Sequence, residues 1–331
     1  MSAAVAVVGA GAWGTALAQV LARDGREVVL WAREAELVGA INDDRRNPLF
    51  LPGIELAPSI RATGDLAEAA TAPVILLVTP AQHLSATIAA LPDVAGRDLV
   101  LCAKGIEAGT LRLMGEVARD GAPGAALAVL SGPTFAAEVA TGLPTAVTLA
   151  CSGGEKQWDR LAPLVAGPAF RPYYSDDIVG AEIGGAVKNV LAIACGVVDG
   201  LQLGQNARAA LISRGFAEML RFGLAMGARA ETLAGLSGLG DLVLTCSSVA
   251  SRNYSLGKAL GEGQSADAVL AARNSVAEGA HTAPVLASLA AAKGVAMPIV
   301  AAVVTLLDGG APAREVVAWL LARPLRAEQG G

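Results

Sequence analysis

Three short segments of the chain combine polar side chains with glycine in otherwise apolar surroundings. They read Ala-Lys-Gly-Ile-Glu at 103–107, Ser-Gly-Pro-Thr-Phe at 131–135 and Gly-Ala-Val-Lys-Asn at 185–189. The first two follow predicted strands, and in open α/β sheets ligands collect at the carboxyl ends of the strands. Lys104, Gly132 and Thr134 are therefore predicted to contact a substrate. The alternative for Lys104 is a solvated surface cation.

The third segment carries Lys188 within the nearly uncharged stretch 183–198. On a helix, Gly184 and Gly185 lie one turn before Lys188, and we interpret these small residues as leaving room for a ligand. Burying a lysine without a partner is costly, so its position indicates either a functional amine or a carboxylate partner elsewhere in the chain. We predict that Lys188 is catalytic.

A further polar group follows the glycine-rich segment 235–240. It consists of Asp241, Thr245, Ser251, Arg252 and Asn253, which supply a carboxylate, hydroxyls, a guanidinium and an amide. Arginine can bind phosphate through two parallel hydrogen bonds, so a phosphorylated ligand fits this group. The alternative is a glycine-rich loop between helices in which Asp or Ser caps a helix, and both interpretations can hold together.

Other kinds of catalytic centre find little support in the sequence. The two histidines, His83 and His281, lie in no recognisable catalytic pattern, and the four cysteines are widely separated without a Cys-x-x-Cys pair. A metal site is therefore not predicted, and the proton donor is sought among the lysines. Tyr254 and Lys258 match the Tyr-x-x-x-Lys pattern of short-chain dehydrogenases, but the glycine fingerprint here is of another type, so we treat this match as coincidence.

These candidate residues need a scaffold, and the first half of the chain predicts one. Short β-rich apolar runs alternate with helical stretches, and strands are predicted at 5–9, 27–31, 74–79, 98–103, 126–131, 146–150 and 170–174. That alternation is typical of βαβ units with a parallel sheet. Beyond Asp176 the strand signals stop and long alanine- and leucine-rich segments follow. We predict an α/β chain with a Rossmann-type NAD(P)-binding domain over 1–175 and an all-α substrate and catalytic domain over 176–331.

The first strand leads into a dinucleotide-binding fingerprint. Residues 9–14 read Gly-Ala-Gly-Ala-Trp-Gly, which is G-x-G-x-x-G between a predicted strand and a predicted helix. Gly9 permits the tight turn, Gly11 lets the backbone approach a pyrophosphate, and Gly14 lets helix and strand pack closely. Backbone N–H groups at the start of the helix then bind the anion. The alternative is a tight glycine turn without a ligand, and Trp13 is more typical of packing than of recognition.

Arg33 bears on the choice between NADP and NAD. NAD-selective folds usually place an acidic side chain after the second strand, where it holds the ribose diol, whereas this chain has Trp31-Ala32-Arg33. An arginine there can meet a 2′-phosphate, so we predict that NADPH is preferred and NADH is the second cofactor. Glu34 is adjacent, and a solvated surface arginine is the alternative.

The overall composition limits the kinds of partner that the protein is expected to bind. A net charge of −5 over 331 residues disfavours general attraction to nucleic acid. The longest apolar stretch, 283–307, is interrupted by Lys293, Gly294 and Pro298, so we interpret it as buried helix and predict no membrane span. The amino terminus lacks the pattern of a secretory signal, and a cytoplasmic location is expected. The apolar helical domain favours a homodimer.

Several different motifs follow one another along almost the whole chain. They include Gly-x-Gly-x-Trp-Gly-Thr-Ala from Gly9, Ala-Lys-Gly-Ile-Glu around Lys104, Ser-Gly-Pro-Thr-Phe-Ala-x-Glu-Val around Gly132, Lys-Asn-Val-x-Ala-Ile-Ala from Lys188 and Gly-Leu-Gly-Asp-Leu around Asp241. In this combination the chain resembles the bacterial NAD(P)-dependent glycerol-3-phosphate dehydrogenases. One departure is Thr134, where serine is common, and the hydroxyl is retained.

The resemblance implies two sets of contacts. The cofactor set is Ala12, Trp13, Arg33, Lys104, Ala136, Arg252, Val276 and Glu278, which joins the fingerprint glycines. The substrate set is Lys104, Gly132, Thr134, Lys188, Asp241, Ser251, Arg252 and Asn253, to which we add the neighbouring Asn189 and Thr245. Lys188, with Lys104 and Asp241 beside it, forms the predicted catalytic group.

The implied activity is the reversible NAD(P)H-dependent reduction of dihydroxyacetone phosphate to sn-glycerol 3-phosphate, the backbone of phospholipids, with Lys188 as proton donor and acceptor. Burial and the Lys104 cation would lower the pKa of Lys188 while Asp241 would raise it, so the sequence leaves the net direction open. The alternatives are another two-domain dehydrogenase of the 6-phosphogluconate or β-hydroxyacid type, and a dinucleotide sensor without catalysis.

Overall fold

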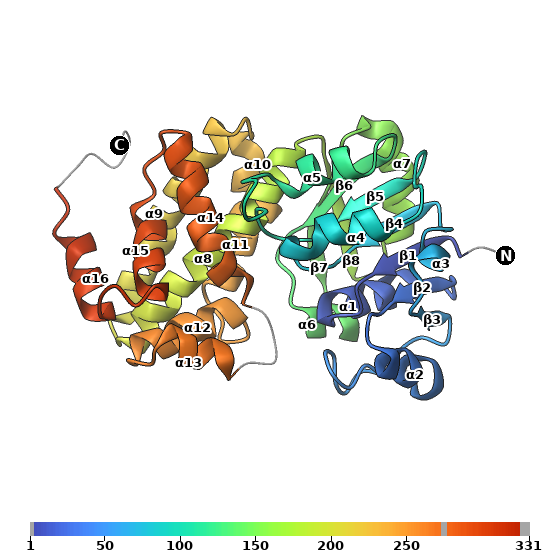
Figure 1. Cartoon of the computed structure of the whole chain (residues 1–331), viewed down its shortest axis with the longest axis horizontal. Coiled ribbons are helices and arrows are strands. Elements are labelled where there is room, and N and C mark those ends of the chain that lie inside the picture. The colour runs from blue at the N-terminus through green and yellow to red at the C-terminus, as the bar shows by residue number, and fades with distance from the viewer. Residues whose placement is uncertain (1–2, 273–276, 325–331) are drawn as a thin grey trace.

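A twisted sheet forms the first part of the chain and helices form the second (Figure 1). The computed structural model describes residues 3–272 and 277–324. Its eight-stranded sheet has the order β3-β2-β1-β4-β5-β6-β7-β8. The strands are β1 (Val5–Val8), β2 (Val28–Trp31), β3 (Ile60–Thr63), β4 (Val74–Leu77), β5 (Asp98–Leu101), β6 (Ala126–Ser131), β7 (Thr145–Cys151) and β8 (Phe170–Ser175).

This strand order confirms the predicted Rossmann-type sheet and corrects two details. β1 pairs in parallel with both β2 and β4, which marks the point where the strand order reverses. β7 runs antiparallel to β6, so the sheet is mostly rather than wholly parallel. The sequence does not predict β3, because this short edge strand reads Ile-Arg-Ala-Thr and exposes Arg61 to solvent.

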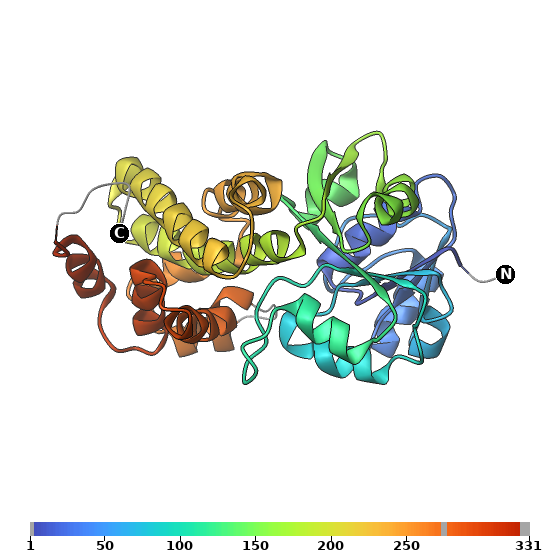
Figure 2. The same ribbon diagram turned by 90° about the horizontal axis from the view of Figure 1, so that it is seen from above.

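Helices cover both faces of the sheet (Figure 2). Successive residues of β1 point to opposite faces: Val5 and Val7 pack with Leu17 in one core, and Ala6 and Val8 pack with Leu84 in the other. The first core also receives side chains from α1 (Ala12–Leu21), α2 (Ala35–Asp44), α6 (Ala136–Thr141) and α7 (Gly154–Val165). The second receives them from α3 (Leu66–Ala69), η1 (Ala81–His83), α4 (Leu84–Ala90) and α5 (Met114–Gly121).

The second part of the chain packs around one long helix, α8 (Ile178–Gly200). The other helices are α9 (Gly204–Ala225), α10 (Ala230–Ala234), η2 (Leu236–Gly240), α11 (Asp241–Thr245), α12 (Arg252–Gly261), α13 (Ala266–Ala271), α14 (Glu278–Ala292), α15 (Pro298–Leu307) and α16 (Ala313–Leu321). In Figure 1 they form the left-hand half of the molecule. Each element that the structure describes after Ser175 is helical, as the sequence predicts.

α8 is apolar and long enough to cross a membrane, but here it is a core helix, because 89% of its most hydrophobic window is buried inside the protein. α12 lies against it at close range. A Cβ atom on Gly257 of α12 would stand 1.9 Å from the Ile193 carbonyl oxygen, and one on Gly196 of α8 would stand 2.0 Å from the Tyr254 carbonyl oxygen. The two helices can approach this closely only because both positions are glycine.

The start of α8 joins the two parts of the fold. Asp177 caps the helix by accepting a hydrogen bond from the Gly180 backbone N–H at 2.8 Å, and its second oxygen accepts one from the Arg229 N–H at 2.8 Å. Ile178 and Ala181 pack in the second core of the sheet, whereas later residues of α8 belong to the helical core. Residues in the middle of α8 therefore lie where sheet and helices meet.

Candidate active site

Two lysines from different parts of the fold share one carboxylate. Lys188 lies on α8, Lys104 follows β5, and Asp241 begins α11. The Lys188 amine donates to Asp241 Oδ1 at 2.5 Å, and the Lys104 amine donates to Asp241 Oδ2 at 2.8 Å. The Asp241 side chain is fully buried, and only 7% of the Lys188 side chain and 14% of the Lys104 side chain are exposed. The carboxylate thus fixes both amines at the boundary between sheet and helices.

The surroundings of Lys188 settle the direction of its pKa shift. Burial lowers the pKa of the amine from its usual value to about 8; Asp241 opposes this shift and the nearby Lys104 cation adds to it. The Thr245 hydroxyl accepts a further hydrogen bond from the amine at 2.9 Å. An amine with a pKa about 8 can both give and take a proton near neutral pH, which suits a group acting as acid in one direction and as base in the other.

Close backbone packing brings Asp241 to Lys188. A Cβ on Gly184 would stand 2.2 Å from the Ser237 carbonyl oxygen, so this glycine lets η2 press against α8. A Cβ on Gly185 would stand 3.2 Å from Cγ of Lys104, so this one makes space for the Lys104 side chain. The interpretation that these glycines leave room for a ligand is therefore wrong, because protein atoms occupy the space beside both.

A second polar cluster lies at the start of α12. The Asn253 amide donates to Asn189 Oδ1 at 3.0 Å and accepts a bond from the Gly279 N–H at 2.9 Å. Ser251 caps α12 by accepting from the Tyr254 N–H at 3.2 Å, so the capping alternative holds for this residue. Asn189, Ser251 and Asn253 are all buried.

Positive charge gathers around Glu278, the first residue of α14. Burial raises the pKa of its carboxyl, while Arg252, Lys104 and Lys188 act in the opposite direction. Arg252 is exposed beside the buried Ser251 and Asn253. Arg252, Lys104 and Lys188 thus all act on the Glu278 carboxyl, and Arg252 is also the first residue of α12.

The segment after β6 completes this side of the site. The Gly132 carbonyl accepts a bond from the Lys104 amine at 3.4 Å and one from the Thr134 hydroxyl at 3.3 Å. Gly132 has φ +155°, and a Cβ there would stand 2.9 Å from Cα of Val147. This position therefore requires glycine, and it fixes the carbonyl beside Lys104.

The glycine-rich turn after β1 has the shape that a dinucleotide requires. Gly9 has φ +118°, and a Cβ on Gly14 would stand 1.8 Å from the Gly9 carbonyl oxygen, so only glycine fits at Gly14. A Cβ on Gly11 would meet nothing within 4 Å, which leaves the start of α1 open to a pyrophosphate. The buried Trp13 Nε1 and Thr79 Oγ1 have no hydrogen-bond partner among residues 3–272 and 277–324. Open backbone and unpaired polar atoms together fit a bound NAD(P).

The remaining predicted residues belong to the predicted cofactor set. Arg33 stands at the end of β2 with 79% of its side chain exposed, and it pairs with Glu34 at 3.0 Å. Ala12 begins α1 and Ala136 begins α6, both partly buried. Val276 lies outside the residues that the structure describes.

Two further buried hydroxyls, those of Thr79 and Ser131, were not among the predicted site residues. Thr79 follows β4 beside Gly9, and a Cβ on Gly9 would stand 3.2 Å from the Thr79 backbone nitrogen. Ser131 ends β6, and its buried hydroxyl has no hydrogen-bond partner within the described part of the chain. A polar side chain at the carboxyl end of a central strand is the signal that could have found both.

Comparison with known proteins identifies the family. Two models of NAD-dependent glycerol-3-phosphate dehydrogenase match the chain, the N-terminal one over residues 4–157 and the C-terminal one over residues 177–318. A glycerol-3-phosphate dehydrogenase of Novosphingobium aromaticivorans, named as using NAD(P)+, is 73% identical over 328 residues, which cover 99% of each chain. This chain belongs to the glycerol-3-phosphate dehydrogenase family.

Other glycerol-3-phosphate dehydrogenases match over the same length. The protein of that name from Erythrobacter litoralis is 67% identical over 328 residues, covering 99% of this chain and 98% of the relative. The crystal structure of the glycerol-3-phosphate dehydrogenase from Coxiella burnetii is 39% identical with a TM-score of 0.91, covering 96% of this chain and 98% of that one. The resemblance inferred from the motifs is therefore confirmed for the whole fold.

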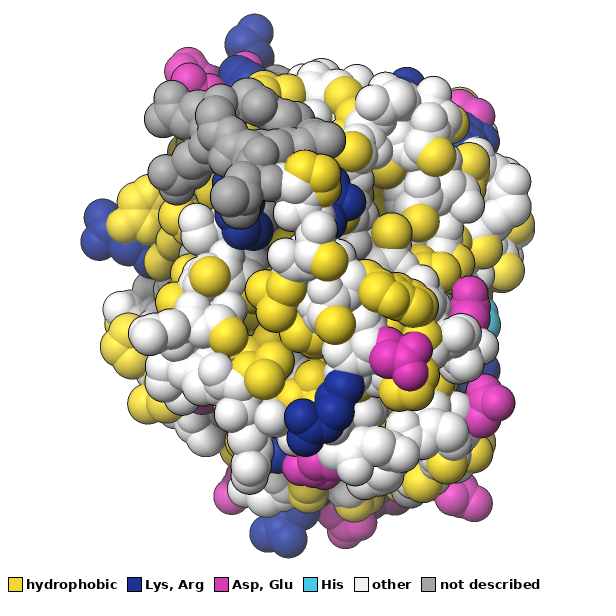
Figure 3. Space-filling model, turned by 90° about the vertical axis from the view of Figure 1, so that its left-hand side faces the viewer, with side chains coloured by type: hydrophobic (Ala, Val, Ile, Leu, Met, Phe, Trp, Pro, Cys, Tyr) yellow, Lys and Arg dark blue, Asp and Glu magenta, His cyan; other side chains and the backbone are white. Residues whose placement is uncertain are grey.

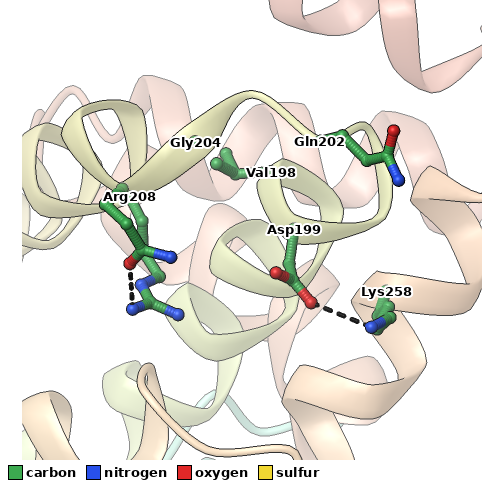
Figure 4. A pocket seen from close by; sticks show the side chains of 7 residues that line it. Val198, Asp199, Gln202, Gly204, Arg208 and Lys258 are labelled. Atoms are coloured by element: carbon green, nitrogen blue, oxygen red, sulfur yellow. Dashed lines mark hydrogen bonds and ion pairs between the residues drawn. The ribbon is translucent and has the colours of Figure 1, made fainter.

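A pocket separate from the lysine site lies at the C-terminal end of α8 (Figure 4). Its volume is about 350 Å³, and it is lined by Val198, Asp199, Gln202, Gly204, Gln205, Arg208 and Lys258. Lys258 pairs with Asp199 at 3.1 Å, and Arg208 donates to the Tyr254 hydroxyl at 3.3 Å. Both cations are already engaged, and the predicted substrate residues are not part of this lining.

Proposed function

We propose that this chain catalyses the reversible reduction of dihydroxyacetone phosphate to sn-glycerol 3-phosphate with NAD(P)H, and thereby supplies the backbone of phospholipids. The observation that carries the proposal is the buried Lys188 amine, held by Asp241 and Thr245 between the sheet and the helices. Family membership supports the substrate pair, because the relatives carry this activity in their names. We assign residues 1–175 to cofactor binding and residues 176–331 to substrate binding and proton transfer.

The cofactor would lie across the carboxyl ends of the first strands. Gly9, Gly11 and Gly14 would place the start of α1 against the pyrophosphate, with Ala12 and Trp13 beside it. Lys104, Ala136, Arg252, Val276 and Glu278 complete the proposed set. When bound, the reduced nicotinamide supplies the hydride that reduces the ketone carbon.

Lys188 would supply the proton for this reduction. As the ketone becomes an alcohol, negative charge grows on its oxygen, and the protonated amine neutralises that charge by giving up its proton. In the reverse direction the neutral amine takes the proton from the alcohol. The lowered pKa, about 8, keeps both forms of Lys188 accessible. Asp241 and Thr245 orient the amine through their hydrogen bonds.

The cluster at the start of α12 would hold the substrate phosphate. Arg252 carries a planar pair of N–H donors, and the amide of the next residue, Asn253, donates to the amide oxygen of Asn189. Ser251 caps the start of α12 next to these residues by accepting a hydrogen bond from the Tyr254 N–H. Gly132 and Thr134 would bound the other side of the substrate, next to Lys104.

We propose that NADPH is preferred over NADH. Arg33 is exposed at the end of β2, where its guanidinium can turn from Glu34 to a ribose 2′-phosphate. The Arg33–Glu34 pair is worth little in solvent, so exchanging it for a doubly charged phosphate is favourable.

A homodimer in the cytoplasm is the proposed working state. On the end of the helical half, hydrophobic side chains are scattered among polar ones (Figure 3). Large exposed apolar residues of this half are Leu203, Leu224, Val243, Val249, Trp319 and Leu321. A second copy of the chain would bury these exposed apolar side chains. Light scattering after size exclusion should then give twice the chain mass. A monomer at micromolar concentration would contradict it.

Purified protein tests the proposed reaction directly. NADPH oxidation is followed with dihydroxyacetone phosphate, with dihydroxyacetone and with a β-keto acid, and NADP+ reduction is followed with 6-phosphogluconate. We expect rapid turnover with dihydroxyacetone phosphate and weak turnover with the other three. A better rate with either of the last two would favour a different dehydrogenase, and NADPH binding without any turnover would favour a sensor.

A further inference from the structure

The backbone around Lys104 forms a projecting loop between β5 and α5. Ile106 and Leu113 face each other as an isolated antiparallel bridge, and the Glu107 N–H donates to the Arg112 carbonyl at 2.9 Å. The loop carries Lys104 from the sheet toward Asp241 on α11, a contact between residues 137 positions apart. The position of the Lys104 amine therefore depends on how this loop is held.

Gln82 of η1 holds the loop with both ends of its side-chain amide. Its Nε2 donates to the Ile106 carbonyl at 2.8 Å, and its Oε1 accepts from the Ala108 N–H at 2.9 Å. Ile106 is fully buried, so its carbonyl needs this partner more than an exposed one would. The amide thus holds the loop at Ile106 and Ala108, shortly after Lys104 and Gly105.

The loop is also tightly packed at Gly105. A Cβ on Gly105 would stand 2.7 Å from Cβ of Ala81 in η1 and 3.5 Å from the Thr282 hydroxyl of α14. Gly105 therefore fits tightly against η1, and α14 also lies close to it. The tight packing of Gly105 and the two hydrogen bonds from Gln82 together leave the loop little freedom to move Lys104.

We propose that Gln82 is a positioning residue for the reaction: its amide bracket fixes the loop so that the Lys104 amine stays on Asp241, beside Lys188. This inference rests on the proposed function, because Lys104 is assigned to substrate and cofactor in that reaction. Gln82 acts through Lys104, since its own amide is occupied by the Ile106 and Ala108 backbone. Displacements of about 1 Å at a positioned group can cost roughly a hundredfold in rate, so a loosened loop is sufficient to impair turnover.

A looser loop also has an electrostatic consequence. The Lys104 cation is one of the charges that lower the pKa of Lys188, so moving it away raises that pKa. Asp241, Cys246 and Glu278 also interact electrostatically with Lys188, and a change at Gln82 replaces none of them. The pKa of Lys188 therefore reports the position of Lys104 without requiring substrate.

The test replaces Gln82 by methionine, which keeps its length and removes both bonds. Asn42→Leu is the matched control, because the Asn42 amide makes the same kind of bracket at Ala62, donating at 3.1 Å and accepting at 2.8 Å, on the far side of the sheet. Lys104→Ala and the double variant Gln82→Met with Lys104→Ala complete a cycle.

Gln82→Met should lower kcat/KM for dihydroxyacetone phosphate by roughly tenfold, with Asn42→Leu within about twofold of wild type at a similar loss of Tm. The double variant should match Lys104→Ala alone. Equal rates for Gln82→Met and Asn42→Leu, or losses that multiply in the double variant, would overturn the inference.

A measurement independent of activity separates this inference from the proposed function. With lysine labelled at Cε, the Lys188 signal is titrated by NMR in the ligand-free wild type, Gln82→Met and Asn42→Leu. Only Gln82→Met should raise the pKa, in the direction that Lys104→Ala raises it. If Lys104→Ala raises the pKa and Gln82→Met does not, Gln82 has no positioning role, whatever reaction the enzyme performs.

Discussion

Replacing Asp241 by asparagine removes a charge that pairs with both lysines. The change keeps the size of the side chain and leaves Lys104 and Lys188 as two cations with a neutral neighbour. Asp241 raises the pKa of Lys188 against burial and Lys104, so its loss should take that pKa below the wild-type value of about 8. The variant therefore changes the protonation of the proposed catalytic amine without touching the amine itself.

The expected change in rate follows from the pKa of Lys188. At pH 7.5 an amine with a pKa about 8 is protonated in roughly three molecules of four, and one with a pKa lower by about one unit in roughly one of four. Reduction needs the protonated form, so kcat/KM for dihydroxyacetone phosphate should fall at pH 7.5, and its decline with rising pH should begin at lower pH than in wild type. Oxidation of glycerol 3-phosphate needs the neutral form, so its rise with pH should shift to lower pH as well.

Stability gives a second readout of the same change. Removing one partner of a buried ion pair costs about 3–5 kcal/mol, so the free energy of unfolding should fall at pH 7 by an amount of this order. This loss should shrink as pH rises, because Lys188 then sheds the proton that has no partner.

Asp98→Asn is the matched control for Asp241→Asn. Asp98 is also buried and binds Gln157 at 2.9 Å and Arg160 at 3.1 Å, away from the lysines. It should lose stability without any shift in the two pH profiles. If Asp241→Asn leaves both profiles where they are in wild type, the electrostatic description of Lys188 is wrong.

Three further variants test the proposed binding roles. Arg33→Ala should raise KM for NADPH by roughly tenfold with little change for NADH, and equal changes for both would remove the 2′-phosphate assignment. Arg252→Ala should raise KM for dihydroxyacetone phosphate by roughly tenfold or more and leave the poor rate with dihydroxyacetone unchanged; an equal loss with both ketones would refute a phosphate contact. Gly14→Ala should abolish NADPH binding in a fluorescence titration because its Cβ would stand 1.8 Å from the Gly9 carbonyl oxygen, and normal binding would contradict the proposed turn geometry.

The parts of the fold that the sequence predicts are those with local signals. Strands such as Val74–Leu77 are buried on both faces and therefore read as continuous apolar runs, and the glycine spacing after Val8 marks one tight turn. The edge strand Ile60–Thr63 carries no such run, and the antiparallel direction of Thr145–Cys151 depends on its partner rather than on its own residues.

For the site as well, the sequence predicts the individual residues but not how packing brings them together. Lys104, Lys188 and Asp241 stand out singly as polar residues in apolar segments, but only the packing of η2 against α8 brings the carboxylate between the amines. Gly184 and Gly185 show the limit most clearly, because small residues signal close approach without saying whether a ligand or another segment approaches. The direction of the Lys188 pKa shift likewise required the depth of burial, which no local pattern gives.

Lys188→Met tests the central role of the buried amine most directly. The variant keeps an unbranched side chain in α8 and removes the only proposed proton donor. Stopped-flow mixing of the NADPH complex with dihydroxyacetone phosphate should show hydride transfer slowed by roughly 10²- to 10⁴-fold, with NADPH affinity unchanged. Hydride transfer at a rate near that of wild type would show that the proton comes from another group.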